Sequence, residues 1–294
     1  MQTGCWRIRT VILAVTAFPW AAMAAPDWPG DATVAVNLTF DLDAETVWWQ
    51  DSRSMTGNPS SLSQGRYGPT VALPKILELL ERHDVVATFF VPTWVIDHYP
   101  DAVRQIVERG HEVGAHGVRH EPPASLTPEE ERVILAESVR VIEALTGRKP
   151  AGYRAPAWAL SDATLALAAE AGFFYSSNLM DHNLPYRHAD PAGLVELPVS
   201  WVLDDAPFFW FDEDSWNKSI HSAADVQEIW REEFAAAYRD GGYFNLTLHP
   251  QFIGRPARLH MLDEFIAWMK SQDGVWFASC ESVARHVSGA AANP

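Results

Sequence analysis

Cysteine is scarce in this chain, which has only Cys5 and Cys280 among 294 residues. Cys5 lies in an N-terminal segment that we expect to be removed, so Cys280 would remain alone and no internal disulfide could form. A domain of this size must then be held together by its hydrophobic core. The apolar setting of Cys280, in VWFASCES, predicts a buried, inert thiol rather than a nucleophile.

Basic residues and long apolar runs are also few. The one candidate run, from Val11, is short for a membrane span and is interrupted by Pro19. Arginines precede it and Ala22-Met23-Ala24 follows it, which predicts a signal peptide over residues 1–24 and a catalytic domain over 25–294. We therefore expect a secreted or periplasmic protein without stable membrane insertion, with an uncleaved anchor as the alternative. The 20 basic and 38 acidic side chains that remain argue against nucleic acid and anionic membranes as partners.

No glycine-rich dinucleotide or phosphate-loop motif follows the first strand-like segment. Strand-like and helix-like segments alternate from residue 34 to the last strand-like stretch at 275–279. Repeated strand-then-helix order predicts an α/β fold with about seven mainly parallel strands, arranged as a distorted or incomplete (β/α) barrel. An open doubly wound sheet is the alternative. Residues 48–74 and 203–219 are expected to be the longest irregular segments.

Polar side chains gather where the predicted strands end. Asp41 and Asp43 are two residues apart at the end of the first strand, so both should face the same side. His116 and His120 follow the third strand, and the working residues of a parallel barrel lie at such C-terminal ends. Two imidazoles and one carboxylate form an open site for zinc or a similar divalent ion. Such a cation would offset the repulsion between the two aspartates, and the second aspartate could take a proton from water.

The neighbouring segment HEVGAH is not a zinc-protease motif. That motif needs two histidines on one face of a helix, whereas His111 and His116 are five apart in a strand-like stretch. We expect His111 to be structural and Glu112 to point away from the site.

Four segments in order resemble the polysaccharide deacetylases of the NodB-homology class, carbohydrate esterase family four. TFDLDAE resembles the first motif with Leu42 inserted, and HGVRH, YRAPAW and LTLHP resemble the second, third and fifth. Together they run from Thr39 to Pro250. The spaced aspartates followed by AETVWW are closer to a branch that includes peptidoglycan deacetylase-like and allantoinase-like proteins.

The resemblance implies roles for individual residues. It implies that Asp43, His116 and His120 bind one divalent metal, with zinc expected and cobalt or another ion possible. It further implies that Asp41 is the general base, that Arg154 pairs with that base, and that His249 is the general acid.

The resemblance also implies how the substrate is held. The backbone N–H of Ala157 would hold the oxyanion, and Trp158 would form a wall of the pocket. The fourth motif has no clean match; Glu196 and the pair Asp204-Asp205 are candidates for the acid that orients His249. We further expect substrate contacts from Trp48, Phe209 and Trp210.

The expected function is metal-dependent N-deacetylation of an N-acetylglucosamine-containing polysaccharide such as peptidoglycan or a chitin-like glycan. One alternative is hydrolysis of a small linear or cyclic amide, in the manner of an allantoinase or imidase; a closed pocket would favour it, and an open groove would favour glycan. A sugar-binding protein that has lost catalysis is the other alternative. A homo-oligomer is a further possible partner state, because aromatic residues exposed on the surface would favour self-association.

Overall fold

The structure is a computed structural model of the chain, and it describes residues 26–51, 58–211 and 220–289. Its centre is β1 (Val34–Asp41), which is buried along its whole length. A strand buried on both faces is typical of the middle of a parallel sheet covered by helices. β1 pairs in parallel with β8 along one edge, and with β9 and then β2 along the other.

The sheet contains nine strands within the described residues, in the order β6-β7-β5-β4-β3-β2-β1-β8, with β9 paired to β1. All pairings are parallel except that of β6 with β7. The other strands are β2 (Thr88–Val91), β3 (Glu112–Ala115), β4 (Gly152–Tyr153), β5 (Tyr175–Ser176), β6 (Tyr186–Arg187), β7 (Val195–Glu196), β8 (Tyr243–Leu248) and β9 (Val275–Phe277).

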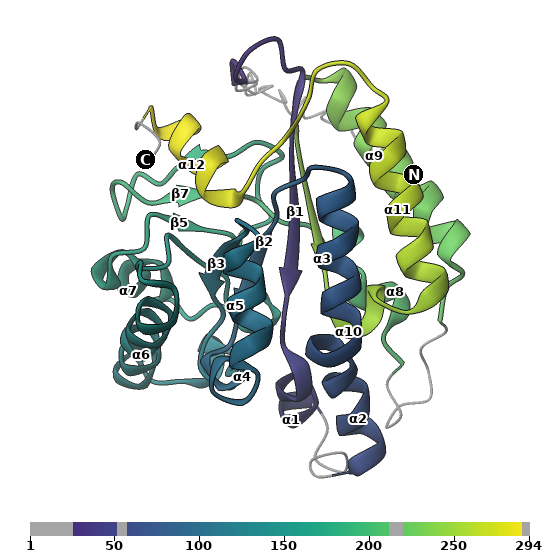
Figure 1. Cartoon of the computed structure of the whole chain (residues 1–294). Helices are drawn as coiled ribbons and strands as arrows, with labels where there is room; N and C mark the ends of the chain where they lie inside the picture. The colour runs from purple at the N-terminus through teal and green to yellow at the C-terminus, as the bar shows by residue number, and fades with distance from the viewer. Residues whose placement is uncertain (1–25, 52–57, 212–219, 290–294) are drawn as a thin grey trace, which may run out of the picture.

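Helices cover the outside of this curled sheet, and Figure 1 shows α9 and α11 together on one side of β1, with α4 to α7 on the other. The α-helices are α1 (Val47–Asp51), α2 (Pro59–Tyr67), α3 (Leu73–Arg82), α4 (Thr93–His98), α5 (Pro100–Glu108), α6 (Pro128–Thr146), α7 (Thr164–Ala171), α8 (Ala206–Phe209), α9 (Ala223–Arg239), α10 (Pro250–Ile253), α11 (Pro256–Lys270) and α12 (Cys280–Ser288). None of the described helices is long and apolar enough to cross a membrane.

An irregular segment, residues 197–205, links the two edges of the sheet. Near β5 the N–H of Leu197 donates to the Ser176 carbonyl at 2.8 Å, and beside β8 the N–H of Asp205 donates to the Thr247 carbonyl at 3.1 Å. Asp204 also forms a parallel bridge with Thr247. The predicted distorted or incomplete (β/α) barrel is therefore confirmed, with nine strands in the described residues instead of about seven and with this segment in place of a regular strand.

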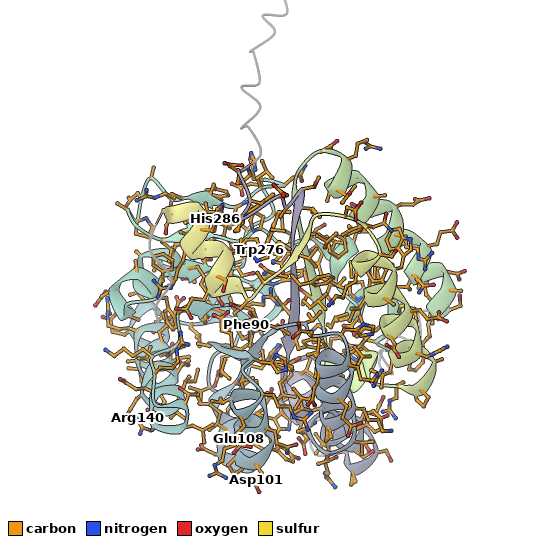
Figure 2. All side chains as sticks on the ribbon, turned by 45° about the horizontal axis from the view of Figure 1, so that its top comes forward. Phe90, Asp101, Glu108, Arg140, Trp276 and His286 are labelled. Carbon is orange, nitrogen blue, oxygen red and sulfur yellow. The ribbon has the colours of Figure 1, made fainter. Side chains whose placement is uncertain are left out.

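The end of the barrel opposite the strand C-termini is closed by α12. The N–H of Glu281, in the first turn of this helix, donates to the partly buried Glu112 carboxylate at 2.9 Å, and Thr88 and Tyr175 donate to the same side chain at 2.8 Å each. Figure 2 shows Trp276 and His286 together at this end, with ring centres 5.7 Å apart. Glu112 thus points away from the strand C-termini, as predicted.

Hydrogen bonds and a glycine define the ends of two helices. A capping box of Thr127 and Glu130 starts α6, and Gly172 ends α7 in the left-handed conformation. The α7 helix begins at Thr164, and the Ser161 hydroxyl just before it donates to Glu131. Cys280 is buried, and burial raises the pKa of its thiol to about 12, in agreement with the prediction of an inert group.

Residues 48–74 were expected to be irregular, and this was wrong. The described part contains α1, α2 and a π-helical turn, Gly68–Ala72, that leads into α3. The sequence did not predict α2 because this helix packs mainly through the small residues Ser61 and Gly65, so it lacks apolar residues at helical spacing. At Gly65, a Cβ would lie 2.5 Å from the Ala44 carbonyl oxygen. This close packing supports the turn that follows β1.

Candidate active site

The turn after β1 carries the two aspartates that the sequence singled out. Asp41 is the last residue of β1, and Asp43 precedes a short 3-10 helix that begins at Ala44. Leu42, between them, is fully buried in the core, so the two carboxylates lie on the same side, as the alternation predicts. Ala44 has a positive φ of 53°, an uncommon conformation for a residue with a side chain.

The loop after β3 brings two histidines to the same place. The Nε2 atom of His116 lies 3.4 Å from Asp43 Oδ1 and 3.8 Å from Asp41 Oδ2, and His120 Nε2 lies 3.9 Å from Asp43 Oδ1. The start of α4 holds this loop, because the N–H groups of Thr93 and Trp94 donate to the carbonyls of Gly117 and Val118.

Asp43, His116 and His120 fit a divalent metal ion. Their ligand atoms lie within 4.8 Å of one another, and ligands of one zinc ion at about 2.0–2.2 Å would be about 3.3 Å apart. His116 Nδ1 lies 2.7 Å from the Arg154 carbonyl, so Nδ1 carries the hydrogen and Nε2 is left with a free lone pair. Asp43 Oδ1 is buried without a hydrogen-bond partner, and coordination to a cation would compensate for this.

The charges in this cluster depend on one another. Burial opposes ionisation of Asp43, but His120, His116 and His249 together lower its pKa to about 2. Burial lowers the pKa of His120 to about 4, which favours the neutral imidazole that binds metals.

Arg154, directly after β4, is fully buried and faces Asp41. Its Nη1 donates to Asp41 Oδ1 at 2.8 Å and to Thr39 Oγ1 at 2.9 Å, and its Nη2 donates to Ser177 Oγ at 3.0 Å. The guanidinium carbon lies 4.2 Å from the centre of the Phe90 ring. The Asp41 carboxylate is thereby held in one orientation in a wall of the site.

Asn178, after β5, positions the segment that follows Arg154. Its Oδ1 accepts from the Ala155 N–H at 2.7 Å, and its Nδ2 donates to the Tyr153 carbonyl at 3.2 Å and to Ser176 Oγ at 2.9 Å. Glu196 accepts from the N–H of Asn178 at 2.7 Å. This network was not predicted from the sequence, because nothing in the local pattern distinguishes Asn178 from an ordinary loop asparagine.

The third motif turns sharply after Pro156. Ala157 and Trp158 both have positive φ, 54° and 51°. Such backbone strain is kept only where the surrounding structure enforces it. Within the described residues, the Ala157 N–H donates to no protein acceptor, so it is available to a ligand oxygen.

His249, after β8, lies beside two acidic residues and is held by one of them, Asp205. Asp205 Oδ1 lies 2.6 Å from His249 Nδ1 and also accepts from the His249 N–H at 3.0 Å. Burial opposes protonation of His249, but Asp204, Asp205 and Asp43 outweigh it and raise its pKa well above the usual value. On the other side of the ring, Nε2 lies 3.7 Å from Asp43 Oδ2.

Of the candidates for the fourth motif, Asp205 therefore contacts His249 and Glu196 does not. Glu196 instead holds the N–H groups of Asn178 and Leu179, and its other oxygen lies 2.9 Å from His188 Nε2. The sequence alone could not distinguish Glu196 from Asp205, because Asp205 contacts His249 only through the pairing of its segment with β8.

A cavity of about 330 Å³ opens above these residues. The polar groups on its walls are Asp41, His116, His120, Asp204 and His249. Its remaining lining is Val47, Ala157, Trp158, Trp201, Ala206, Pro207, Trp210 and Phe252.

The structure places three of the five predicted substrate-contact residues on the cavity wall. Ala157, Trp158 and Trp210 line the cavity, whereas Trp48 and Phe209 do not. Trp48 is 4 % exposed and packs edge-on against Trp210, and Phe209 is 2 % exposed beneath Arg258. Trp48 also contacts Phe252, so it packs behind two residues of the cavity wall.

Comparison with known proteins identifies the family. The family model for polysaccharide deacetylase matches residues 67–176. The peptidoglycan deacetylase of Helicobacter pylori is 32 % identical over 279 residues, which cover 85 % of this chain and 95 % of that protein. This chain belongs to the polysaccharide deacetylase family.

Solved structures of family members share the whole fold. A Mycobacterium smegmatis protein assigned to the polysaccharide deacetylases is 38 % identical, with a TM-score of 0.87 over 92 % of this chain and 98 % of its own. The Puue allantoinase is 25 % identical, with a TM-score of 0.81 over 92 % and 95 %. The chain is thus similar both to a protein named as a peptidoglycan deacetylase and to one named as an allantoinase.

Gln251 is a further residue of this deacetylase-family site that sequence reasoning missed. It is buried in α10, two residues after His249, and its Nε2 donates to Asp43 Oδ2 at 3.3 Å. The contact leaves Asp43 Oδ1 free to face the two histidines. Its position just beyond the fifth motif was the one signal that could have pointed to it.

Proposed function

We propose that this protein is a metal-dependent amide hydrolase that removes acetyl groups from N-acetylglucosamine units of peptidoglycan or a similar glycan. We further propose that it acts outside the cytoplasm after loss of residues 1–24. The observation that carries the proposal is that the two histidines of a buried Asp-His-His cluster, a paired aspartate and a paired histidine line one cavity. Together they provide the groups that water attack on an amide needs.

In this proposal Asp43, His116 and His120 hold one divalent ion. When bound, the ion is a Lewis acid that acidifies water and polarises the amide carbonyl. Zinc suits two imidazoles and a carboxylate, and cobalt is accepted by the same ligands.

The other residues move protons and hold charge. Asp41, kept in place by Arg154, takes a proton from the attacking water. The Ala157 N–H donates to the carbonyl oxygen as negative charge builds on it. His249, held through Nδ1 by Asp205, donates a proton to the departing nitrogen. The carbon–nitrogen bond breaks, and the products are acetate and a free amine.

The test is acetate release from N-acetylglucosamine oligomers and peptidoglycan fragments by the metal-loaded protein. We expect release by the natural chain and loss of at least about 100-fold with Asp41→Asn, which removes the base but no metal ligand. Metal content should be unchanged in that variant. If the metal-loaded natural chain releases no acetate from any glycan, the deacetylase proposal is wrong.

A second candidate is hydrolysis of a small cyclic or linear amide. Two observations favour it: the likeness to the Puue allantoinase, and aromatic walls from Trp158, Trp201 and Trp210 around a cavity of about 330 Å³. Ring opening of a cyclic ureide or imide by the same preparation, without acetate release from glycans, would support this candidate instead.

A further inference from the structure

Asp204 is a cavity carboxylate that the proposed reaction leaves unused. It is 4 % exposed and lines the cavity together with Asp41 and His249. Its neighbour Asp205 is fully buried and does not line the cavity. Keeping two adjacent carboxylates out of water is unfavourable unless each has a partner. Asp205 has His249, so the partner of Asp204 has to be identified.

Orienting His249 does not account for Asp204. The Nδ1 atom of His249 lies 2.6 Å from Asp205 Oδ1 but 3.6 Å from Asp204 Oδ1. A ring nitrogen carries one hydrogen, and the shorter contact with Asp205 uses it. Asp204 adds negative charge near the ring without holding it.

Stabilising the local turn accounts for only one of the two oxygens. Asp204 Oδ1 accepts from the Ala206 N–H at 2.7 Å, at the start of α8. Among the described residues, Oδ2 has no hydrogen-bond donor, although the side chain is more than nine-tenths buried. The space in front of Asp204 is the cavity itself, so a bound molecule is the group that can reach this oxygen.

We infer that Asp204 is a substrate-binding residue whose Oδ2 accepts a hydrogen bond from a hydroxyl or N–H group beside the amide that is cleaved. The inference rests on the proposed amide hydrolysis and defines the substrate class further. The substrate carries a second hydrogen-bond donor near the acetamido group, as a polyhydroxylated amino sugar does.

The rest of the cavity explains why this contact selects substrates. Trp158, Trp201, Trp210 and Phe252 present ring surfaces, which pack against an amide with or without hydroxyl groups. Asp204 differs from these aromatic walls, because a bound ligand without a hydrogen-bond donor would leave its Oδ2 atom buried and unpaired. Sites that hydrogen-bond a substrate hydroxyl reject analogues that lack it.

A matched pair of variants tests the inference. Asp204→Asn keeps an oxygen for the Ala206 N–H and replaces the cavity-facing acceptor with an amide donor. We expect KM for N-acetylglucosamine oligomers to rise at least tenfold and by a larger factor than any fall in kcat that follows from the lost charge beside His249, with unchanged metal content. Asp205→Asn, one residue away, should instead lower kcat, because it acts through His249. A fall in kcat at unchanged KM for Asp204→Asn, or no change at all, would overturn the inference.

Binding without turnover gives an independent measurement. In the His249→Gln background, calorimetry with an N-acetylglucosamine oligomer should show at least tenfold weaker binding when Asp204→Asn is added. Equal affinity with and without Asp204→Asn would refute the role of Asp204, and so would an oligomer that binds neither protein. Acetate release by the natural chain is a separate readout, so failure of the proposed reaction is distinguishable from failure of this inference.

Discussion

The Arg154 guanidinium donates to the Asp41 carboxylate at 2.8 Å in a part of the protein where neither residue is more than 4 % exposed. Removing one partner of a buried ion pair leaves an uncompensated charge, which costs about 3–5 kcal/mol. The pair therefore links the stability of the barrel to the position of the proposed base. The same guanidinium holds Thr39 and Ser177, so β1, β4 and β5 meet at this one side chain.

Arg154→Lys should lower both the stability of the barrel and the activity that depends on the position of Asp41. Lysine is a point charge and cannot reproduce the donors that reach Asp41, Thr39 and Ser177. We expect kcat to fall about 100-fold and the free energy of unfolding to fall by about 2–4 kcal/mol. The measurements are acetate release and chemical denaturation, with Arg104→Lys in an exposed pair with Asp101 as the control. Activity within threefold of the natural chain would contradict the proposed role of the pair.

Asp205→Asn should lower kcat by about 10–100-fold, because the asparagine can no longer hold a protonated His249 through a charged contact. The metal cluster lies on other segments, so metal content and KM should change little. Glu196→Gln is the comparison, since Glu196 was an alternative orienting acid and does not contact His249. If Glu196→Gln lowered kcat while Asp205→Asn did not, the assignment of the orienting acid would be wrong.

The sequence predicted those parts of the site whose position follows from strand ends. Asp41, Asp43, His116 and His249 each follow or end a strand, and parallel strands bring such residues to one end of a barrel. Local rules sufficed here because the alternation of side chains and the strand order determine the outcome.

The parts that were missed depend on contacts between distant segments. Asn178 reaches Ala155 from the next strand, and Gln251 reaches Asp43 from the opposite side of β1. The inward or outward direction of Trp48 and Phe209 depends on how short helices pack on one another. Periodicity within a segment does not contain that information.

Asn178→Leu tests whether the Asn178 side chain positions the third motif, which contains Arg154 and Ala157. Leucine has a similar size but leaves the buried Ala155 N–H unpaired, which costs about 1–3 kcal/mol, whereas the Tyr153 carbonyl keeps its hydrogen bond from the Ser177 N–H. We expect lower stability, and also a fall in kcat because Arg154 and the Ala157 N–H follow the same segment. Asn178→Asp keeps the acceptor for Ala155 and should retain more activity than leucine. Equal kcat in the two variants would show that the Ala155 contact does not position the site.

His111 should make the fold sensitive to acid. Burial, with a smaller contribution from Arg109, lowers the pKa of His111 from 6.5 to about 4, and its Nδ1 accepts from the Ala87 N–H at 3.2 Å. Between these pH values the unfolded chain binds a proton that the folded protein does not, so stability falls as pH drops from 6.5 toward 4. At about 1.4 kcal/mol per pKa unit, this one group contributes on the order of 3 kcal/mol.

His111→Gln keeps an acceptor for the Ala87 N–H and removes the titration. Its free energy of unfolding, measured by denaturant at several pH values between 7.5 and 4.5, should depend less steeply on pH than that of the natural chain. His260→Gln, on an exposed part of α11, is the control and should retain the original slope. An unchanged slope in His111→Gln would contradict this account of acid sensitivity.

The most direct test of the central claim is a metal titration of chelator-treated protein, followed by acetate release from N-acetylglucosamine oligomers. The account predicts that release returns with zinc or cobalt and reaches its maximum at one ion per chain. It also predicts that Asp43→Asn neither binds the ion tightly nor recovers activity. Full acetate release by the metal-free protein, or full recovery in Asp43→Asn, would contradict the claim that Asp43, His116 and His120 hold a catalytic metal.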